Sequence, residues 1–155
     1  MSRSTSSAGF QPAFNDLLVG WKTVRIGDVV LKKVEQHIPS GPETILYIDI
    51  GSVDNSAKRI TETKSIPAAT APSRARQKVA TGDILVSMTR PNLNAVAVVP
   101  PDLDGATAST GFDVLRPSEA VLSDWIFLIV RSRHFVDAMT ALVQGALYPA
   151  VRPAD

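Results

Sequence analysis

The chain contains no cysteine and no long apolar run. Without cysteine it can form neither disulfide bonds nor thiolate metal sites, which indicates a reducing compartment. Its longest apolar run, residues 125–130, is far shorter than the roughly 20 residues of a membrane-spanning helix. The first stretch, MSRSTSSAGF, is polar and lacks the apolar segment of a secretory signal. These absences predict a cytoplasmic protein.

The sequence is also short of the motifs that most enzymes need. Its two histidines, His37 and His134, do not share a metal-ligand spacing. It has no glycine-rich loop of the kinds that hold a dinucleotide or a nucleotide phosphate. None of its serines stands in the Gly-x-Ser-x-Gly setting of an activated nucleophile. We therefore predict that this chain binds no cofactor and no metal of its own.

What the sequence does have is an ordinary globular composition with an uneven distribution of charge. Its 155 residues are 45% hydrophobic and 20% charged, which is enough for one domain with its own core. The net charge is only +1, yet seven basic residues face two acidic ones between residues 58 and 90. A nearly neutral protein with one positive face can still attract a phosphate backbone. The alternative is that these charges form an ordinary solvated surface.

Apolar runs predict strands in the first two thirds of the chain, and helical spacing predicts two short helices in the last third. β-branched and aromatic residues favour strands at 44–50, 82–88, 94–99 and 111–117. Residues 122–129 and 135–143 have helical spacing, with Ser123 as the expected N-cap of the first helix and Gly145 after the second. This order of elements predicts an α+β fold with both helices on one side of the sheet.

The pattern of polar and apolar residues also predicts which parts are ordered and buried. Residues 1–19 are expected to form a flexible N-terminal arm, and residues 20–155 a single domain. The large aromatic side chains are expected in the core of that domain. They are Trp21, Phe112, Trp125 and Phe135.

The most informative stretch is SRARQKVATGDILVSMTRP, residues 73–91, in which basic side chains stand on both sides of an apolar strand. Arginine binds phosphate with two parallel hydrogen bonds, and asparagine can donate to and accept from an adenine edge. We expect phosphate contacts from Lys64, Arg74, Arg76 and Lys78, and groove contacts from Arg90, Asn92 and Asn94. Tyr148 is expected either against the sugar–phosphate backbone or in the core. The basic stretch APSRARQ is expected to be an exposed loop.

Two other functions fit parts of the same sequence. Asp49, followed by Glu62 and Lys64 on the next strand, is the pattern of a metal-dependent nuclease, with two carboxylates for Mg²⁺ and a lysine for the attacking water. The same Glu62 and Lys64 can equally lie on the solvent face of an edge strand. The second alternative is a protein-interaction domain that has lost DNA binding.

Six stretches follow one another from residue 20 to the C-terminus: GWKTVRIGDV, YIDIGSVD, APSRARQKVATGDILVSMTRPNLNAVAVV, STGFDVLRP, WIFLIVRSRHF and GALYPAV. In this order they resemble a target recognition domain from the DNA specificity subunit of type I restriction-modification systems. The resemblance implies an α+β unit with a curved, mostly antiparallel sheet that reads one half of a bipartite double-stranded DNA site. It also implies a subunit with no catalytic activity of its own.

The resemblance further implies which partners to expect. Modification subunits use S-adenosylmethionine to methylate adenine, and restriction subunits consume ATP, so these cofactors and Mg²⁺ would belong to partner subunits. The sequence ends at VRPAD, where the family continues through a proline-rich link into a long spacer helix. We therefore expect one recognition domain without the spacer and the second domain: a fragment, a half-subunit that self-associates, or a remnant. A single domain with few phosphate contacts should bind DNA with strong salt dependence, at about micromolar affinity or weaker.

Overall fold

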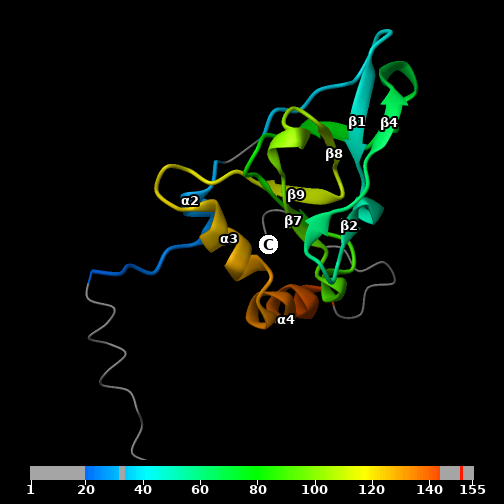
Figure 1. Ribbon diagram of the computed structural model, residues 1–155. Helices are drawn as coiled ribbons and strands as arrows, with labels where there is room; N and C mark the ends of the chain where they lie inside the picture. The colour runs from blue at the N-terminus through cyan, green and yellow to red at the C-terminus, as the bar shows by residue number, and fades with distance from the viewer. Residues whose placement is uncertain (1–19, 32–33, 144–150, 152–155) are drawn as a thin grey trace, which may run out of the picture.

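The computed structural model describes residues 20–31, 34–143 and 151. The expected N-terminal arm, Gly145 and Tyr148 lie outside these residues. After one helical turn, short strands occupy the chain up to residue 115, and two helices follow (Figure 1). The helices are α2 (Ile26–Val29), α3 (Ser123–Val130) and α4 (Arg133–Leu142). The strands are β1 (Thr44–Ile48), β2 (Val53–Asp54), β3 (Arg59–Ile60), β4 (Lys64–Pro67), β5 (Ala75–Lys78), β6 (Ile84–Ser87), β7 (Val96–Val98), β8 (Thr107–Ser109) and β9 (Phe112–Leu115).

The strands form two sheets and one separate hairpin. The larger sheet has the strand order β4-β1-β8-β5, the smaller one has the order β7-β6-β9, and β2 pairs with β3. Among the described strands every pairing is antiparallel except that of β1 with β8. Short 3-10 helices connect several strands: η1 (Ile50–Ser52), η2 (Ala68–Thr70), η3 (Pro91–Leu93) and η4 (Pro101–Leu103). The predicted α+β class with a mostly antiparallel sheet is confirmed.

The first hydrophobic core lies between the two sheets. Successive side chains of a strand point to opposite faces, so Leu85 of β6 and Val114 of β9 point towards the larger sheet. There they pack with Ile48 of β1 and Ala108 of β8. Ile48, Leu85 and Ala108 are completely buried. Burying an Ile or Leu side chain contributes roughly 1.5–3 kcal/mol, so this layer is the main source of stability.

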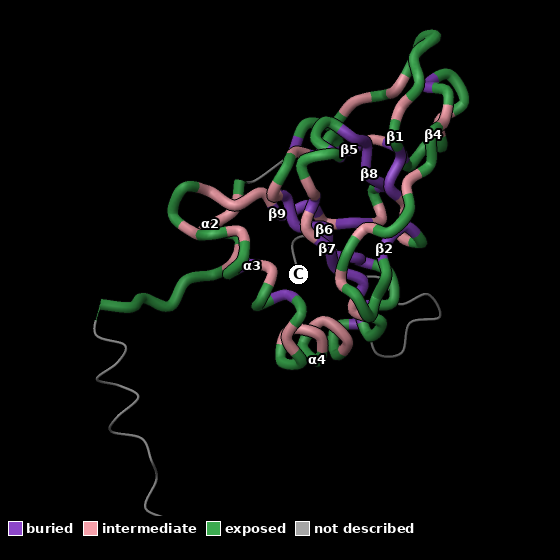
Figure 2. The backbone as a smooth tube through the Cα atoms, in the orientation of Figure 1, coloured by how far each residue is buried: buried purple, intermediate pink, exposed green. Residues whose placement is uncertain are grey.

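The second core lies on the opposite face of the smaller sheet, where the helices cover it. Ile84 and Val86 of β6 pack against Ile126 and Val130, which stand one turn apart on α3. Phe135 of α4 is half-buried against the same cluster. Figure 2 shows the buried positions concentrated in the strands, whereas the helices carry mixed burial. The expected placement of both helices on one side of a sheet is confirmed.

Two of the four aromatic residues expected in the core lie at the surface instead. Phe112 is 2% exposed, as predicted, but Trp21 is 63% exposed and Trp125 is 44% exposed. The two indoles pack against each other edge to face, with ring centroids 5.9 Å apart. The prediction for Trp21 and Trp125 was wrong. The two residues are far apart in the sequence, so no local pattern reveals that they pack against each other, and this packing covers each indole only in part.

The helix starts differ from each other in how they are capped. Ser132 caps α4 as its side chain accepts a hydrogen bond from the Phe135 amide at 3.3 Å. Ser123, expected to cap α3, is instead the first residue of that helix, and its hydroxyl donates to the Gly82 carbonyl at 2.7 Å. The expected cap at Ser123 was therefore wrong, because a contact with the turn before β6 uses its hydroxyl.

Candidate nucleic-acid interface

The basic stretch before the buried strand is itself largely a strand. Ala75 and Gln77 of β5 are buried, whereas the alternate positions Arg74, Arg76 and Lys78 are exposed or half-buried. Arg74 directly precedes the strand, and the burial pattern leaves the three basic side chains on the outward side despite an irregularity in the pairing between Ala75 and Gln77. The expectation of an exposed loop was wrong for residues 75–77, because Ala75 and Gln77 fill inward positions of a strand, which the polar sequence APSRARQ does not reveal.

Strand β5 is fixed along both of its edges. It pairs with β8 on one side, and on the other side the Lys78 amide donates to the Glu35 carbonyl at 2.9 Å and the His37 amide to the Arg76 carbonyl at 2.8 Å. The buried Gln77 amide group donates to the Ser109 and Phe112 carbonyls, both at 2.9 Å. The basic side chains therefore stand on a rigid backbone.

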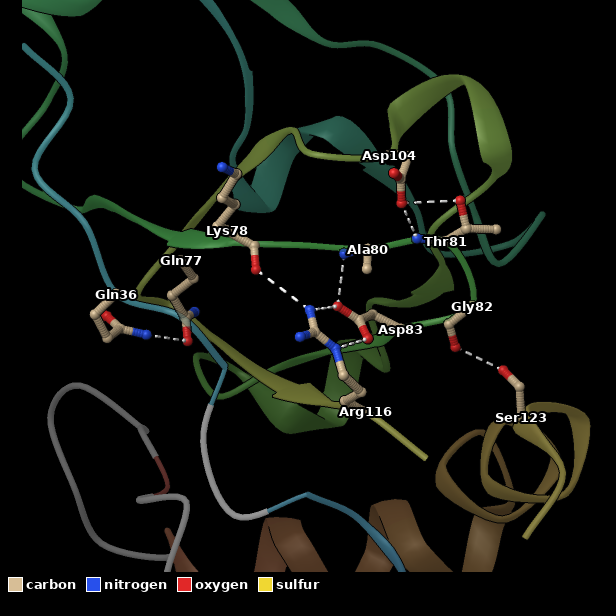
Figure 3. Close-up of polar contacts among 10 residues, drawn as sticks. All are labelled: Gln36, Gln77, Lys78, Ala80, Thr81, Gly82, Asp83, Asp104, Arg116 and Ser123. Atoms are coloured by element: carbon tan, nitrogen blue, oxygen red, sulfur yellow. Dashed lines mark hydrogen bonds and ion pairs between the residues drawn. The ribbon is translucent and has the colours of Figure 1, made fainter. Parts of the chain in front are cut away.

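A half-buried ion pair fixes the turn between β5 and β6 (Figure 3). Arg116 donates from Nε to Asp83 Oδ1 at 2.8 Å and from Nη2 to Oδ2 at 2.7 Å. Asp83 is 1% exposed and also accepts from the Ala80 amide at 2.8 Å. The hydrogen bonds and charge of Asp83 raise the pKa of Arg116 despite the opposing effect of burial. Arg116 also reaches the Lys78 carbonyl at 3.4 Å, so this pair ties β9 to β5 and β6.

At the other end of β6, Arg74 and Arg90 both lie near the turn between β8 and β9. The Thr110 amide donates to the Arg74 carbonyl, and the Met88 amide donates to the Gly111 carbonyl, both at 2.9 Å. The turn between β8 and β9 thus lies between the start of β5 and the end of β6. Arg90 follows two residues after Met88 with a φ of 51° and is exposed.

The loop around η3 carries the other predicted groove residues. Asn92 is exposed on η3 itself, whereas Asn94 is half-buried at its end with a φ of 50°. The Asn94 side-chain amide donates to the Arg131 carbonyl at 3.0 Å, and its Oδ1 is buried. Base reading by Asn94 stays a prediction, and it would require this hydrogen bond to break. Asn92 and Arg90 are the groups on this loop that face solvent freely enough to reach another molecule.

Lys64 does not join the other basic residues. It lies on β4, at the opposite edge of the larger sheet from β5, and forms an ion pair with Asp49. Partial burial acts to raise the pKa of Asp49, but Lys64 and the hydrogen bonds of Ser52 outweigh it and hold that pKa below its ordinary value. Glu62 is exposed, and the described residues hold no cluster of metal-ligating side chains. The Asp49 carboxylate is thus engaged within the chain.

Sequence reasoning missed two basic residues that the fold brings together with the η3 loop. Lys58, in the β2–β3 turn, donates to the Asn94 carbonyl at 2.6 Å, and Arg131, between α3 and α4, is bonded to the Asn94 side chain. These contacts join positions 36 and 37 residues apart, so no local signal in the sequence could have predicted them. No described helix is long and apolar enough to cross a membrane.

Known proteins resemble this chain over most of its length, although no protein-family model matches it. The HindI type I restriction enzyme specificity subunit of Haemophilus influenzae is 26% identical over 134 residues, which cover 84% of this chain and 29% of that protein. A chain from a structural study of complex assembly and conformational transition in the type I R-M system is 38% identical, with a TM-score of 0.80, over 85% of this chain and 35% of its own. The HsdS subunit of Thermoanaerobacter tengcongensis is 36% identical, with a TM-score of 0.76, over 83% of this chain and 34% of its own.

The likeness is one of sequence and of fold at the same time. The chain spans about a third of the length of each of these relatives. This likeness in sequence and in fold confirms the predicted resemblance to a target recognition domain of type I restriction-modification specificity subunits.

Proposed function

We propose that this domain binds double-stranded DNA and reads one half of a bipartite target for a type I restriction-modification complex. The observation that carries the proposal is the combined likeness to specificity subunits, at 36–38% identity with TM-scores of 0.76 and 0.80. The domain is residues 20–155, and its role is to supply specificity to a complex whose chemistry is done elsewhere. Its expected site of action is the cytoplasm.

The surface that supports DNA contact is the edge formed by β5 and the end of β6. Arg74, Arg76 and Lys78 share the outward side of β5, and Arg90 and Asn92 follow β6 on the η3 loop. Within the described residues none of these four cations forms an ion pair with a carboxylate. Cations without a carboxylate partner are available to displace counterions from a phosphate backbone. We assign phosphate contacts to β5 and base contacts to Arg90 and Asn92, and we leave out Lys64 because Asp49 holds it.

The partners follow from the same proposal. The domain would act with modification subunits, which carry S-adenosylmethionine, and through them with restriction subunits, which use ATP and Mg²⁺. Self-association with a second copy is the arrangement that would supply a second half-site. Size-exclusion chromatography of the chain with and without a modification subunit measures both associations.

The experiment that tests DNA binding is the fluorescence anisotropy of a labelled random-sequence duplex titrated with the chain at low salt. The triple variant R74A/R76A/K78A should bind roughly tenfold or more weakly, because phosphate contacts dominate affinity. The matched control K22A/R25A/R133A loses the same charge from exposed positions away from β5. Equal binding by the wild type and the β5 variant would contradict the proposed surface, and no binding by the wild type would contradict the proposed function.

The nuclease alternative has a separate test. Incubation of the chain with plasmid DNA and Mg²⁺ should leave the plasmid intact, because the Asp49 carboxylate is engaged with Lys64 and Ser52. Cleavage that Glu62→Ala abolishes would favour the nuclease instead.

A further inference from the structure

Three segments that are distant in sequence meet at the end of η3. Lys58 donates its ammonium to the Asn94 carbonyl oxygen at 2.6 Å. The Asn94 side-chain nitrogen donates to the Arg131 carbonyl oxygen at 3.0 Å. One residue thus holds the β2–β3 turn and the corner between α3 and α4 in fixed relation. Asn94 thereby links the Lys58 ammonium to the backbone of Arg131.

The two cations lack a matching carboxylate. Neither Lys58 nor Arg131 forms an ion pair within the described part of the chain. Asp54 is the acidic group that acts on Lys58, but its Oδ1 accepts hydrogen bonds from the Ser56 and Ala57 amides, at 2.8 and 2.9 Å. Burial, and after it the charge of Arg131, lower the pKa of Lys58. Holding like charges together is unfavourable unless an anion binds between them.

Both cations are also held in defined positions. The guanidinium carbon of Arg131 lies 5.1 Å from the centre of the Phe127 ring, a cation–π contact that restricts the side chain. Lys58 has a φ of 54°, in the left-handed region that most residues avoid. An ammonium has three donors, and Lys58 uses one of them on Asn94, so two remain for a ligand. Several fixed donors around one point suit a ligand with several anionic oxygens.

We propose that Lys58 and Arg131 together bind one phosphate of the DNA backbone, and that Asn94 is the positioning residue that holds them. The inference rests on the proposed DNA binding and adds a second phosphate site to it. Arg90 stands at the start of η3 and the Lys58–Arg131 pair at its end, with exposed Asn92 between them. A phosphate contact at the end of η3 would help to fix the register in which Arg90 and Asn92 meet the base edges.

The test is the salt dependence of duplex binding by the double variant K58N/R131Q. Asparagine tolerates a positive φ, so the turn is kept while the charge is lost. Losing one phosphate contact should make the slope of log K against log salt less steep by about 0.9, and weaken binding roughly tenfold at about 50 mM salt. The control K22N/R25Q has the same substitutions and charge change on the segment before α2 and should keep the wild-type slope.

A second variant tests the positioning role. Asn94→Gly keeps both cations and the positive φ of residue 94 and removes the bond to Arg131, so affinity should fall while urea unfolding and the salt slope stay close to wild type. An unchanged slope in K58N/R131Q, with wild-type DNA binding intact, would overturn this inference and leave the proposed function standing. A wild-type chain that binds no duplex would overturn the proposed function and this inference with it.

Discussion

The two ends of β6 carry basic side chains that are used in different ways. Where β6 begins, Arg116 is bonded through two nitrogens to Asp83, which is almost fully buried. Where β6 ends, Arg90 and the neighbouring Arg74 are exposed and pair with no carboxylate of the described chain. The same residue type therefore stabilises the fold at one end and is available to a ligand at the other. The burial of the partner carboxylate decides between these roles, and the local sequence does not.

Removal of Arg116 should have the largest effect on stability. Arg116→Ala leaves the Asp83 charge buried without its partner, which should lower the free energy of unfolding by about 3 kcal/mol. Urea unfolding followed by circular dichroism measures the change. Arg133→Ala removes an i,i+4 pair with Asp137 whose side chains are 94% and 70% exposed, and should leave the unfolding midpoint unchanged. Equal urea midpoints for both variants would mean that the Asp83–Arg116 pair does not stabilise the fold.

The opposite pattern is expected at the other end of β6. The double variant R74A/R90A should weaken duplex binding roughly tenfold by the loss of charge-assisted contacts. Its urea midpoint should equal that of the wild type, because both side chains are exposed. Anisotropy and urea unfolding of the same preparation provide both readings. A stability loss without a binding loss would assign these arginines to the fold.

The pH dependence of stability is expected to reveal a third role for a charged residue, that of the half-buried Asp113 on β9. Burial raises the pKa of Asp113, against a hydrogen bond from the Val114 backbone. A carboxyl with a raised pKa in the folded state contributes stability below its unfolded pKa and loses it as the pH rises through the folded value. Asp113→Asn should therefore be more stable than the wild type at neutral pH, and the gain should vanish at acid pH. Thermal unfolding from pH 3 to pH 8 measures it, and a gain independent of pH would contradict the assignment.

The smallest effect is expected at the surface pair of Asp49 and Lys64. The pKa of Asp49 is held below its ordinary value, so this carboxylate contributes stability above its unfolded pKa and loses it as the pH falls through the folded value. Lys64→Met should therefore lower stability slightly at neutral pH, with the difference disappearing in acid, and should leave duplex affinity unchanged. A large loss of affinity would mean that Lys64 contacts DNA.

The parts of the fold that local patterns could predict are those with apolar runs. The strands at β1, β6, β7 and β9 and both C-terminal helices come from β-branched runs and helical spacing. Strand β8, Thr107–Ser109, has no such run, and its burial comes from pairing with β1 and β5. The parallel partner of β8 lies about sixty residues earlier, a distance at which a single sequence carries no pairing signal.

The sequence predicted which residue types form the candidate site, but it predicted their arrangement only in part. The basic stretch around β5 was visible as charge, but its alternation of buried and outward residues depends on the sheet it joins. Lys58 was visible only as part of the basic excess between residues 58 and 90, and Arg131 gave no signal, because no local pattern connects either residue to Asn94. Long-range hydrogen bonds, which local patterns do not encode, thus decide which cations lie together.

The most direct test of DNA contact at the end of β6 is an amide NMR titration of the labelled chain with a short duplex. We predict that shifts concentrate on residues 73–78 and 89–94, with Lys58 and Arg131, while the amides of Ala80 to Asp83 and of α2 stay in place. Shifts centred on α2 or on the Asp83–Arg116 pair, or no shifts at all, would contradict it.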